Sequence, residues 1–323
     1  MKPSADETRR SYEKFHYGLR TAKNIERKML CEALHRLSAF DRLDTYRYIG
    51  FGSAYFSDFI LFHKSLGIDD LISIECDIDK AARFAFNCPF NCVTVEMGLS
   101  TEILPKLSWE KKSIVWLDYN DPLQSLVLAD VAFFCANAAP GSVLLVTVDA
   151  QPGEDKEKGL DRLQRLEQSV GRAKVPGGVR KKDLAKWGTA TVSRRIIDNE
   201  VRQQLHARSG ALPAARKVQY RQLFNFHYAD GAKMLTVGGM IYENGQTDQV
   251  DRSAFENLAF IRDGIEPFLI EAPVLTYREL RHLDSQLPRD SDSVLDAPGV
   301  PDNDVENYRL LYRYFPTFAE AEL

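Results

Sequence analysis

The sequence of 323 residues is long enough for one large α/β domain with additions, or for two modest domains. Its 44% hydrophobic and 27% charged residues are ordinary globular values, which exclude a chain that is disordered throughout. A net charge of −4 excludes a general nucleic-acid coat, and no apolar run reaches the roughly 18 residues of a membrane-spanning helix. The first residues lack the apolar core of a signal peptide, which predicts a cytoplasmic protein.

The N-terminal part is expected to be helical over residues 5–37, because apolar residues recur there at steps of three and four. Gly18 is a candidate break within this segment. A row of polar residues also follows the helix, and its favoured interpretation is a solvated face. The row consists of Arg20, Lys23, Asn24, Glu26 and Arg27.

Strands and helices are predicted to alternate from residue 46 to residue 148. Short and mostly apolar segments are interpreted as strands, and helical segments separate them. Strands of this kind are typical of a sheet covered by helices on both faces, so the predicted fold class is α/β with a mostly parallel sheet. The predicted strands are 46–49, 71–75, 92–96, 113–117 and 142–148.

The rest of the chain departs from this alternation. Residues 151–217 are polar with a helical tendency, whereas 218–228 and 234–242 are β-type segments joined by a hairpin turn. Residues 286–307 are rich in Asp, Ser and Pro, so they are expected to form a loosely packed loop. The aromatic end from Tyr308 onward is expected to pack against the body.

Two glycines follow the first predicted strand, in the order Gly50-Phe-Gly52-Ser53, and a helix comes next. Glycine lets the backbone turn tightly and approach a ligand closely. Glu75 ends the next strand, where a carboxylate can accept both hydroxyl groups of a ribose. Tyr55 stands where the dinucleotide-binding pattern has its third glycine, so a nucleoside without pyrophosphate is favoured.

This order of strand, Gly-x-Gly, helix, strand and acid, with Asp77 two residues after Glu75, resembles the first two motifs of class I S-adenosylmethionine-dependent methyltransferases. The resemblance covers about residues 44–150, together with the hairpin of 218–242, because that family ends its parallel sheet with an antiparallel pair. Two further segments are similar to bacterial proteins described only as O-methyltransferases of unknown substrate, namely residues 17–29 and 273–279.

The resemblance implies a Rossmann-like fold and S-adenosylmethionine as cofactor. It places the glycine turn under the methionine and ribose, and the acid of the second strand on the ribose hydroxyls. The segment after the third strand flanks the adenine, and many family members carry an acid where this chain has Leu99. An N-terminal helix can also form a lid over the cofactor cleft. The implied cofactor-binding residues are Gly50, Gly52, Ser53, Glu75, Asp77, Gly98, Leu99 and Asp118.

A second candidate site follows the fourth strand, at the sheet edge where α/β proteins bind ligands. In the resembled fold this segment faces the methyl group and the acceptor. Asp118 has the alternative role of capping the next helix. Asp121-Pro122 partly matches a motif of amino-methyltransferases, so methylation of nitrogen stays open beside methylation of oxygen. The candidate catalytic residues are Asp118, Tyr119, Asn120 and Asp121.

An oxygen acceptor usually needs a base or a metal ion to remove its proton. Asp118 and His227 are candidate bases, although a histidine among aromatic residues in a strand is more often structural. His63 is expected to lie in the core on a helix. Cys88 and Cys92 lack a second pair of ligands at zinc spacing, so no metal site is predicted.

Charge is unevenly distributed along the second half of the chain. Residues 172–217 hold 12 Lys and Arg against 3 Asp and Glu, and residues 284–323 hold 3 Arg against 9 acids. The basic stretch favours an RNA or DNA acceptor, while the alternative is neutralisation within the chain or across a homodimer. A small-molecule acceptor also stays open, and no membrane partner is predicted.

Three hypotheses for function follow. The first is an S-adenosylmethionine-dependent O- or N-methyltransferase, and the second is an inactive methyltransferase-like module that binds a nucleotide or a partner. The third, a nicotinamide oxidoreductase, is disfavoured by Tyr55 and by the terminal hairpin. The expected segments are a helical lid of 1–40, a Rossmann-like core of 41–150, a basic helical insertion of 151–217, a hairpin of 218–250 and an extension of 251–323.

Overall fold

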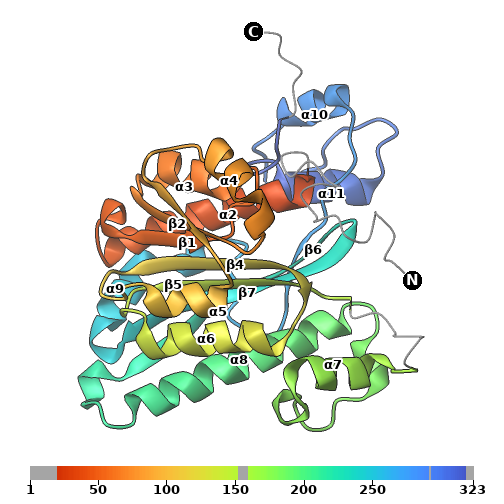
Figure 1. Ribbon diagram of the computed structural model, residues 1–323. Helices are drawn as coiled ribbons and strands as arrows, with labels where there is room; N and C mark the ends of the chain where they lie inside the picture. Colours follow the sequence, from red (N-terminus) through yellow and green to blue (C-terminus); the bar gives the residue numbers. More distant parts are fainter. Residues whose placement is uncertain (1–19, 152–158, 291, 318–323) are drawn as a thin grey trace.

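A computed structural model of the chain describes residues 20–151, 159–290 and 292–317. At its centre lies one sheet of eight strands in the order β3-β2-β1-β4-β5-β7-β6-β8 (Figure 1). The strands are β1 Arg47–Gly50, β2 Asp70–Glu75, β3 Val93–Met97, β4 Ser113–Pro122, β5 Val143–Asp149, β6 Val218–Asp230, β7 Ala232–Glu243 and β8 Phe268–Ile270.

The sheet is mostly parallel and closes with an antiparallel pair. Strands β1 to β5 all run in one direction, and β7 runs antiparallel to both β5 and β6. The predicted fold class, a Rossmann-like sheet that ends in an antiparallel hairpin, is confirmed. Strand β8 adds a short parallel edge next to β6 that the sequence did not predict.

Helices cover both faces of the sheet, as Figure 1 shows: α2 and α3 lie on one face, and α6 and α8 lie on the other. None of the helices in the described ranges is long and apolar enough to cross a membrane. The helices are α2 Thr21–His35, α3 Ser57–Leu66, α4 Ala81–Asn87, α5 Ser100–Ile103, α6 Ser125–Asn137, α7 Arg162–Val170, α8 Gly188–Ser209, α9 Thr247–Ser253, α10 Tyr277–Asp284 and α11 Asp302–Leu311.

Strand alternation decides which side chains of β4 reach each face. Successive side chains of a strand point to opposite faces, so Trp116 packs in the core under α2 and α3. Val115 and Leu117 pack in the core under α6 and α8. The same alternation continues into the predicted site residues that follow Leu117.

The tip of the β6–β7 hairpin holds the start of α2. The carboxylate of Asp230 accepts hydrogen bonds from the backbone N–H groups of Ala22, at 3.1 Å, and Lys23, at 2.8 Å. The first N–H groups of a helix have no partner within the helix, and a negative charge there is favourable. Residues about 200 positions apart therefore fix where α2 crosses the sheet. The part of the expected helix before residue 20 lies outside the described residues.

The expected loop of 286–307 is wrong in its last part, because α11 begins at Asp302. Pro301 precedes this helix and acidic residues occupy its first turn, both of which suit a helix start. The helix joins a small separate core, and Phe315 also packs there, which agrees with the expected docking of the aromatic end. The buried members of this core are Leu283, Leu295, Val305 and Tyr308.

Candidate functional site

The predicted site residues gather where β1 and β4 lie side by side. Gly50, the last residue of β1, pairs in register with Trp116 of β4. The chain leaves β1 toward β2 on one side, and β4 continues toward β5 on the other. Open α/β sheets bind ligands at the carboxyl ends of strands next to such a switch point.

The glycine turn after β1 admits no side chain at Gly52. A Cβ atom there would lie 2.5 Å from the Phe56 ring and 2.7 Å from Ser73 Oγ. The N–H of Gly52 donates to that same Ser73 Oγ at 2.9 Å. Ser53 follows with a φ of +52° and directs its N–H toward Glu75 at the end of β2. The backbone of the turn therefore packs directly against the end of β2.

Glu75 at the end of β2 binds this turn through its side chain. Its Oε1 accepts hydrogen bonds from the N–H of Ser53 and from Ser73 Oγ, both at 2.8 Å. The side chain is buried, with 7% of the residue exposed, and burial raises the pKa of its carboxyl to about 7. The structure thus brings together the glycine turn and the acid, as the sequence predicted. Asp77 instead pairs with Lys80 at 3.4 Å, within the next turn of the chain.

The segment after β3 lies beside Glu75. Gly98 donates its N–H to the carbonyl oxygen of Glu75 at 2.9 Å and adopts a φ of +148°. Leu99 follows with 53% of its surface exposed and precedes α5. An apolar side chain is therefore presented to solvent next to the buried acid.

The four candidate catalytic residues after Leu117 do not point the same way. Tyr119 turns to the face of α6, where it donates to the carboxylate of Asp130 and contacts the Phe51 ring at 5.1 Å between ring centroids. Burial is the main cause that raises the pKa of Tyr119. Asn120 and Asp121 are exposed. Tyr119 therefore forms part of the wall under the glycine turn.

Asp118 points to the opposite face and meets helix α2. Its carboxylate lies 2.9 Å from Lys23 Nζ, and its side chain is 22% exposed. The alternative role of Asp118 as a helix cap is wrong, because α6 begins at Ser125 after Gln124 and no side chain caps it. Asp118 belongs instead to the extended β4, whose pairing with β5 shifts register before Pro122.

Lys23 is the centre of a buried polar cluster. Its ammonium group lies 2.8 Å from Glu26 and 3.1 Å from the hydroxyl of Tyr228, besides its contact with Asp118. It also lies 4.4 Å from the ring centroid of Trp116. Burial is the largest cause that raises the pKa of Glu26, and Lys23 opposes this shift.

The solvated-face interpretation of the polar row on α2 is therefore wrong. Lys23 is 1% exposed, and Glu26 and Arg27 are buried as well. Two partners of Lys23, Asp118 and Tyr228, lie on β4 and β6, so no local pattern in α2 could reveal them. This part of the site was not predicted from the sequence because Lys23 is far from Asp118 and Tyr228 along the chain.

The candidate base His227 and the predicted core residue His63 both lie away from Asp118. His227 is buried on the face of α6 and α8, where it stacks on Trp187 at 4.8 Å between ring centroids. Burial lowers the pKa of His227 to about 4. His63 was expected in the core, but its side chain is 27% exposed, because Phe59 and Phe62 face the core on that helix.

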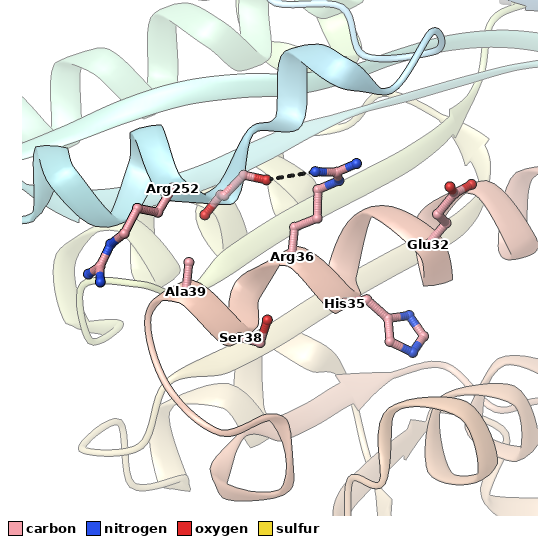
Figure 2. A pocket seen from close by; sticks show the side chains of 7 residues that line it. Glu32, His35, Arg36, Ser38, Ala39 and Arg252 are labelled. Carbon is pink, nitrogen blue, oxygen red and sulfur yellow. Dashed lines mark hydrogen bonds between the residues drawn. The ribbon is translucent and has the colours of Figure 1, made fainter.

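A small pocket adjoins the site. A pocket of about 100 Å³ lies between the end of β4, α7 and α8, and Pro122, Gln124 and Ser193 are among its lining residues. A larger pocket of about 610 Å³ (Figure 2) contains no predicted site residue. In Figure 2, Arg36 at one side of it donates to the carbonyl oxygen of Ser253 at 3.2 Å.

A family model described as "Putative O-methyltransferase" matches residues 15–323. The chain belongs to this family. The predicted resemblance is confirmed, and so is the predicted class of enzyme, a methyltransferase. No curated protein matches the sequence.

Two solved O-methyltransferases are similar to the chain at low identity. TomG from Streptomyces achromogenes, in complex with SAM, is 16% identical with a TM-score of 0.36, and the match covers 65% of this chain and 79% of that one. An enzyme from Bacillus cereus, in complex with SAH, is 13% identical with a TM-score of 0.35, covering 65% and 80%. Similarity at this level assigns no substrate to this chain.

Proposed function

We propose that the chain is an S-adenosylmethionine-dependent methyltransferase that acts on a hydroxyl group of an unidentified acceptor. The observation that carries this proposal is the contact of Glu75 with the glycine turn, at the edge between β1 and β4. Membership of an O-methyltransferase family supports both the cofactor and the oxygen acceptor.

In this proposal the cofactor lies across the ends of β1, β2 and β3. The hydrogen bonds from Ser53 and Ser73 both reach Oε1 of Glu75, and Oε2 is the oxygen that we assign to the ribose hydroxyls. The absence of a Cβ at Gly52 lets the turn pack directly against Phe56 and Ser73, which fixes the backbone that we place under the cofactor. The exposed side chain of Leu99 provides an apolar surface for the adenine ring.

S-adenosylmethionine supplies a methyl group on a positively charged sulfur. When bound, it would transfer this methyl group from its sulfur to the acceptor oxygen, and a protein side chain would take up the proton of the acceptor hydroxyl. Such a displacement depends mainly on aligning the reactants and excluding water. We assign Asp118 to accept the hydrogen bond, and then the proton, of the hydroxyl, because it is the partly exposed member of its cluster. Lys23 and Glu26 position Asp118 from the buried side.

Titration calorimetry with S-adenosylmethionine, S-adenosylhomocysteine and NADH tests the cofactor assignment. We expect micromolar binding of the first two and no binding of the third. Binding of NADH alone would overturn the proposal in favour of an oxidoreductase. An acceptor screen that detects released S-adenosylhomocysteine then separates a working enzyme from a module that only binds the nucleoside.

Contacts within the chain bear on the nucleic-acid alternative. Arg194 is buried and donates to Gln222 at 2.6 Å, and Lys174 pairs with Glu200. Arg208 donates to two backbone carbonyl groups at the end of α6. These three side chains are engaged within the protein, and Glu200 balances the charge of Lys174. Other basic side chains of the stretch are exposed, such as Arg172 at 90%. The acceptor screen therefore includes RNA as one class beside small hydroxyl compounds.

A further inference from the structure

Three side chains with metal-binding atoms meet at the edge of the sheet opposite the cofactor site. His63 lies on α3, Asp69 directly precedes β2, and Cys92 directly precedes β3. One ligand atom from each residue lies within 4.8 Å of the other two. These atoms stand at the starts of parallel strands, whereas the cofactor site stands at their ends.

The two distances from His63 to the other ligand atoms suit a tetrahedral zinc ion. His63 Nδ1 lies 3.6 Å from Cys92 Sγ and 3.1 Å from Asp69 Oδ1. Zinc bonds of about 2.1 Å to nitrogen, 2.0 Å to oxygen and 2.3 Å to sulfur, at tetrahedral angles, separate these pairs by about 3.6 and 3.3 Å. The imidazole and thiolate also favour zinc over calcium or magnesium, which prefer oxygen ligands.

The surroundings hold the histidine ring in place. The ring packs on Phe90, with 4.4 Å between ring centroids. Nδ1 also lies 3.0 Å from the carbonyl oxygen of Ile68, which can only accept a hydrogen bond. A metal ion on Nδ1 would replace this hydrogen bond, and the ring would then carry its proton on Nε2. One thiolate and one carboxylate balance the two positive charges of zinc, and the thiol proton is released on binding.

We propose that His63, Asp69 and Cys92 bind one zinc ion, with water as the fourth ligand. The ion joins the C-terminal half of α3 to the starts of β2 and β3. It stabilises the fold at a distance from methyl transfer, so the proposal is independent of the proposed function. From the sequence, Cys88 and Cys92 were considered as a pair of ligands, and this site was therefore missed. Cys88 does not join the cluster, because its Sγ points to the carbonyl oxygens of Phe90 and Val93.

The test uses the full chain without a polyhistidine tag, freed of metal by a chelator. Cobalt(II) serves as the first probe, because a thiolate–cobalt bond has a characteristic ultraviolet absorption band, and zinc then displaces it. We expect one equivalent of metal per chain and loss of that band on addition of zinc. Absence of the band at saturating cobalt would overturn the proposal.

Matched variants decide whether these residues are the ligands. We expect Cys92→Ser to abolish the thiolate band, and His63→Gln and Asp69→Asn to weaken zinc binding at least tenfold. Asp69 has a side chain that is 73% exposed, so its variant stays folded and remains informative if the others do not. Cys88→Ser is the control and keeps wild-type affinity. Equal zinc affinity in Asp69→Asn and the wild type, or loss of the band in Cys88→Ser, would overturn the assignment.

Discussion

The ammonium group of Lys23 lies 2.9 Å from the carboxylate of Asp118, and this contact joins helix α2 to the end of β4. The backbone of the same lysine is held by Asp230 at the hairpin tip, at 2.8 Å. Two acids from different strands therefore fix both the main chain and the side chain of Lys23. The candidate acceptor site is built only when β4, the hairpin and α2 have all come together.

Lys23→Met is expected to lower the free energy of unfolding by about 3 kcal/mol, because it leaves Asp118 and Glu26 without their buried partner. Urea denaturation followed by circular dichroism measures the change. Lys111→Met is the matched control, since Lys111 pairs with Asp70 at 2.7 Å but is 54% exposed. That exposed pair contributes at most about 1 kcal/mol, and an equal loss in both variants would contradict the prediction.

Glu75→Gln is expected to weaken binding of S-adenosylmethionine roughly 10-fold to 100-fold, because hydrogen bonds to a charged group contribute about 1.5–3 kcal/mol. Glutamine keeps the volume of the side chain, so the glycine turn stays supported. Asp77→Asn is the comparison variant, and its pairing with Lys80 predicts a loss below about threefold. Calorimetry of both variants checks the ranking, which would fail if the Asp77 variant lost more affinity.

Because the carboxyl of Glu75 is buried, we also expect the free energy of unfolding to depend on pH. Its pKa rises from 4.5 to about 7 on folding, chiefly because of burial. The unfolded chain loses this proton at lower pH than the folded protein. The free energy of unfolding that the protonated Glu75 contributes is therefore lost as pH rises from about 4.5 to 7. The loss reaches at most about 3 kcal/mol, at 1.36 kcal/mol per pH unit.

Glu75→Gln cannot titrate, so its stability relative to the wild type is expected to increase between pH 5 and pH 7.5. Urea denaturation at these two pH values measures the difference. Glu110→Gln, at an exposed position, serves as the control. A constant difference between the Glu75 variant and the wild type would contradict the raised pKa.

The central sheet was predictable because its strands are apolar segments bounded by turns. The predicted strand at 113–117 captured the buried part of β4 but not its extension to Pro122, where exposed polar residues replace the apolar ones. The pairing of Glu75 with the glycine turn was predictable because both follow neighbouring parallel strands. The order of strands and motifs along the sequence shows which strand ends lie side by side in such a sheet.

Contacts between distant residues were not predictable. Lys23 and Tyr228 are 205 positions apart, and His63 and Cys92 are 29 apart on different elements. A charged residue on an amphipathic helix is usually solvated, so only the observed partner shows that Lys23 is buried. Strand β8 has three residues, too few for an alternating pattern to be recognised.

His227→Phe separates a structural from a catalytic histidine. Neither ring nitrogen of His227 has a hydrogen-bond partner within the described part of the chain, and the ring stacks on Trp187 at an angle of 22°. Phenylalanine keeps the stacking and removes two unpaired polar atoms, so stability at pH 7 is expected to stay equal or to rise by about 1 kcal/mol. Release of S-adenosylhomocysteine, once an acceptor is known, is expected to be unchanged.

The pH dependence of this variant gives a second measurement. Burial lowers the pKa of His227 from 6.5 to about 4, so its contribution to stability is present above pH 6.5 and is lost as pH falls toward 4. His227→Phe removes that loss, and the variant is expected to gain on the wild type between pH 7 and pH 4.5. If instead the variant were as stable as the wild type throughout but released no S-adenosylhomocysteine, His227 would be the base in place of Asp118.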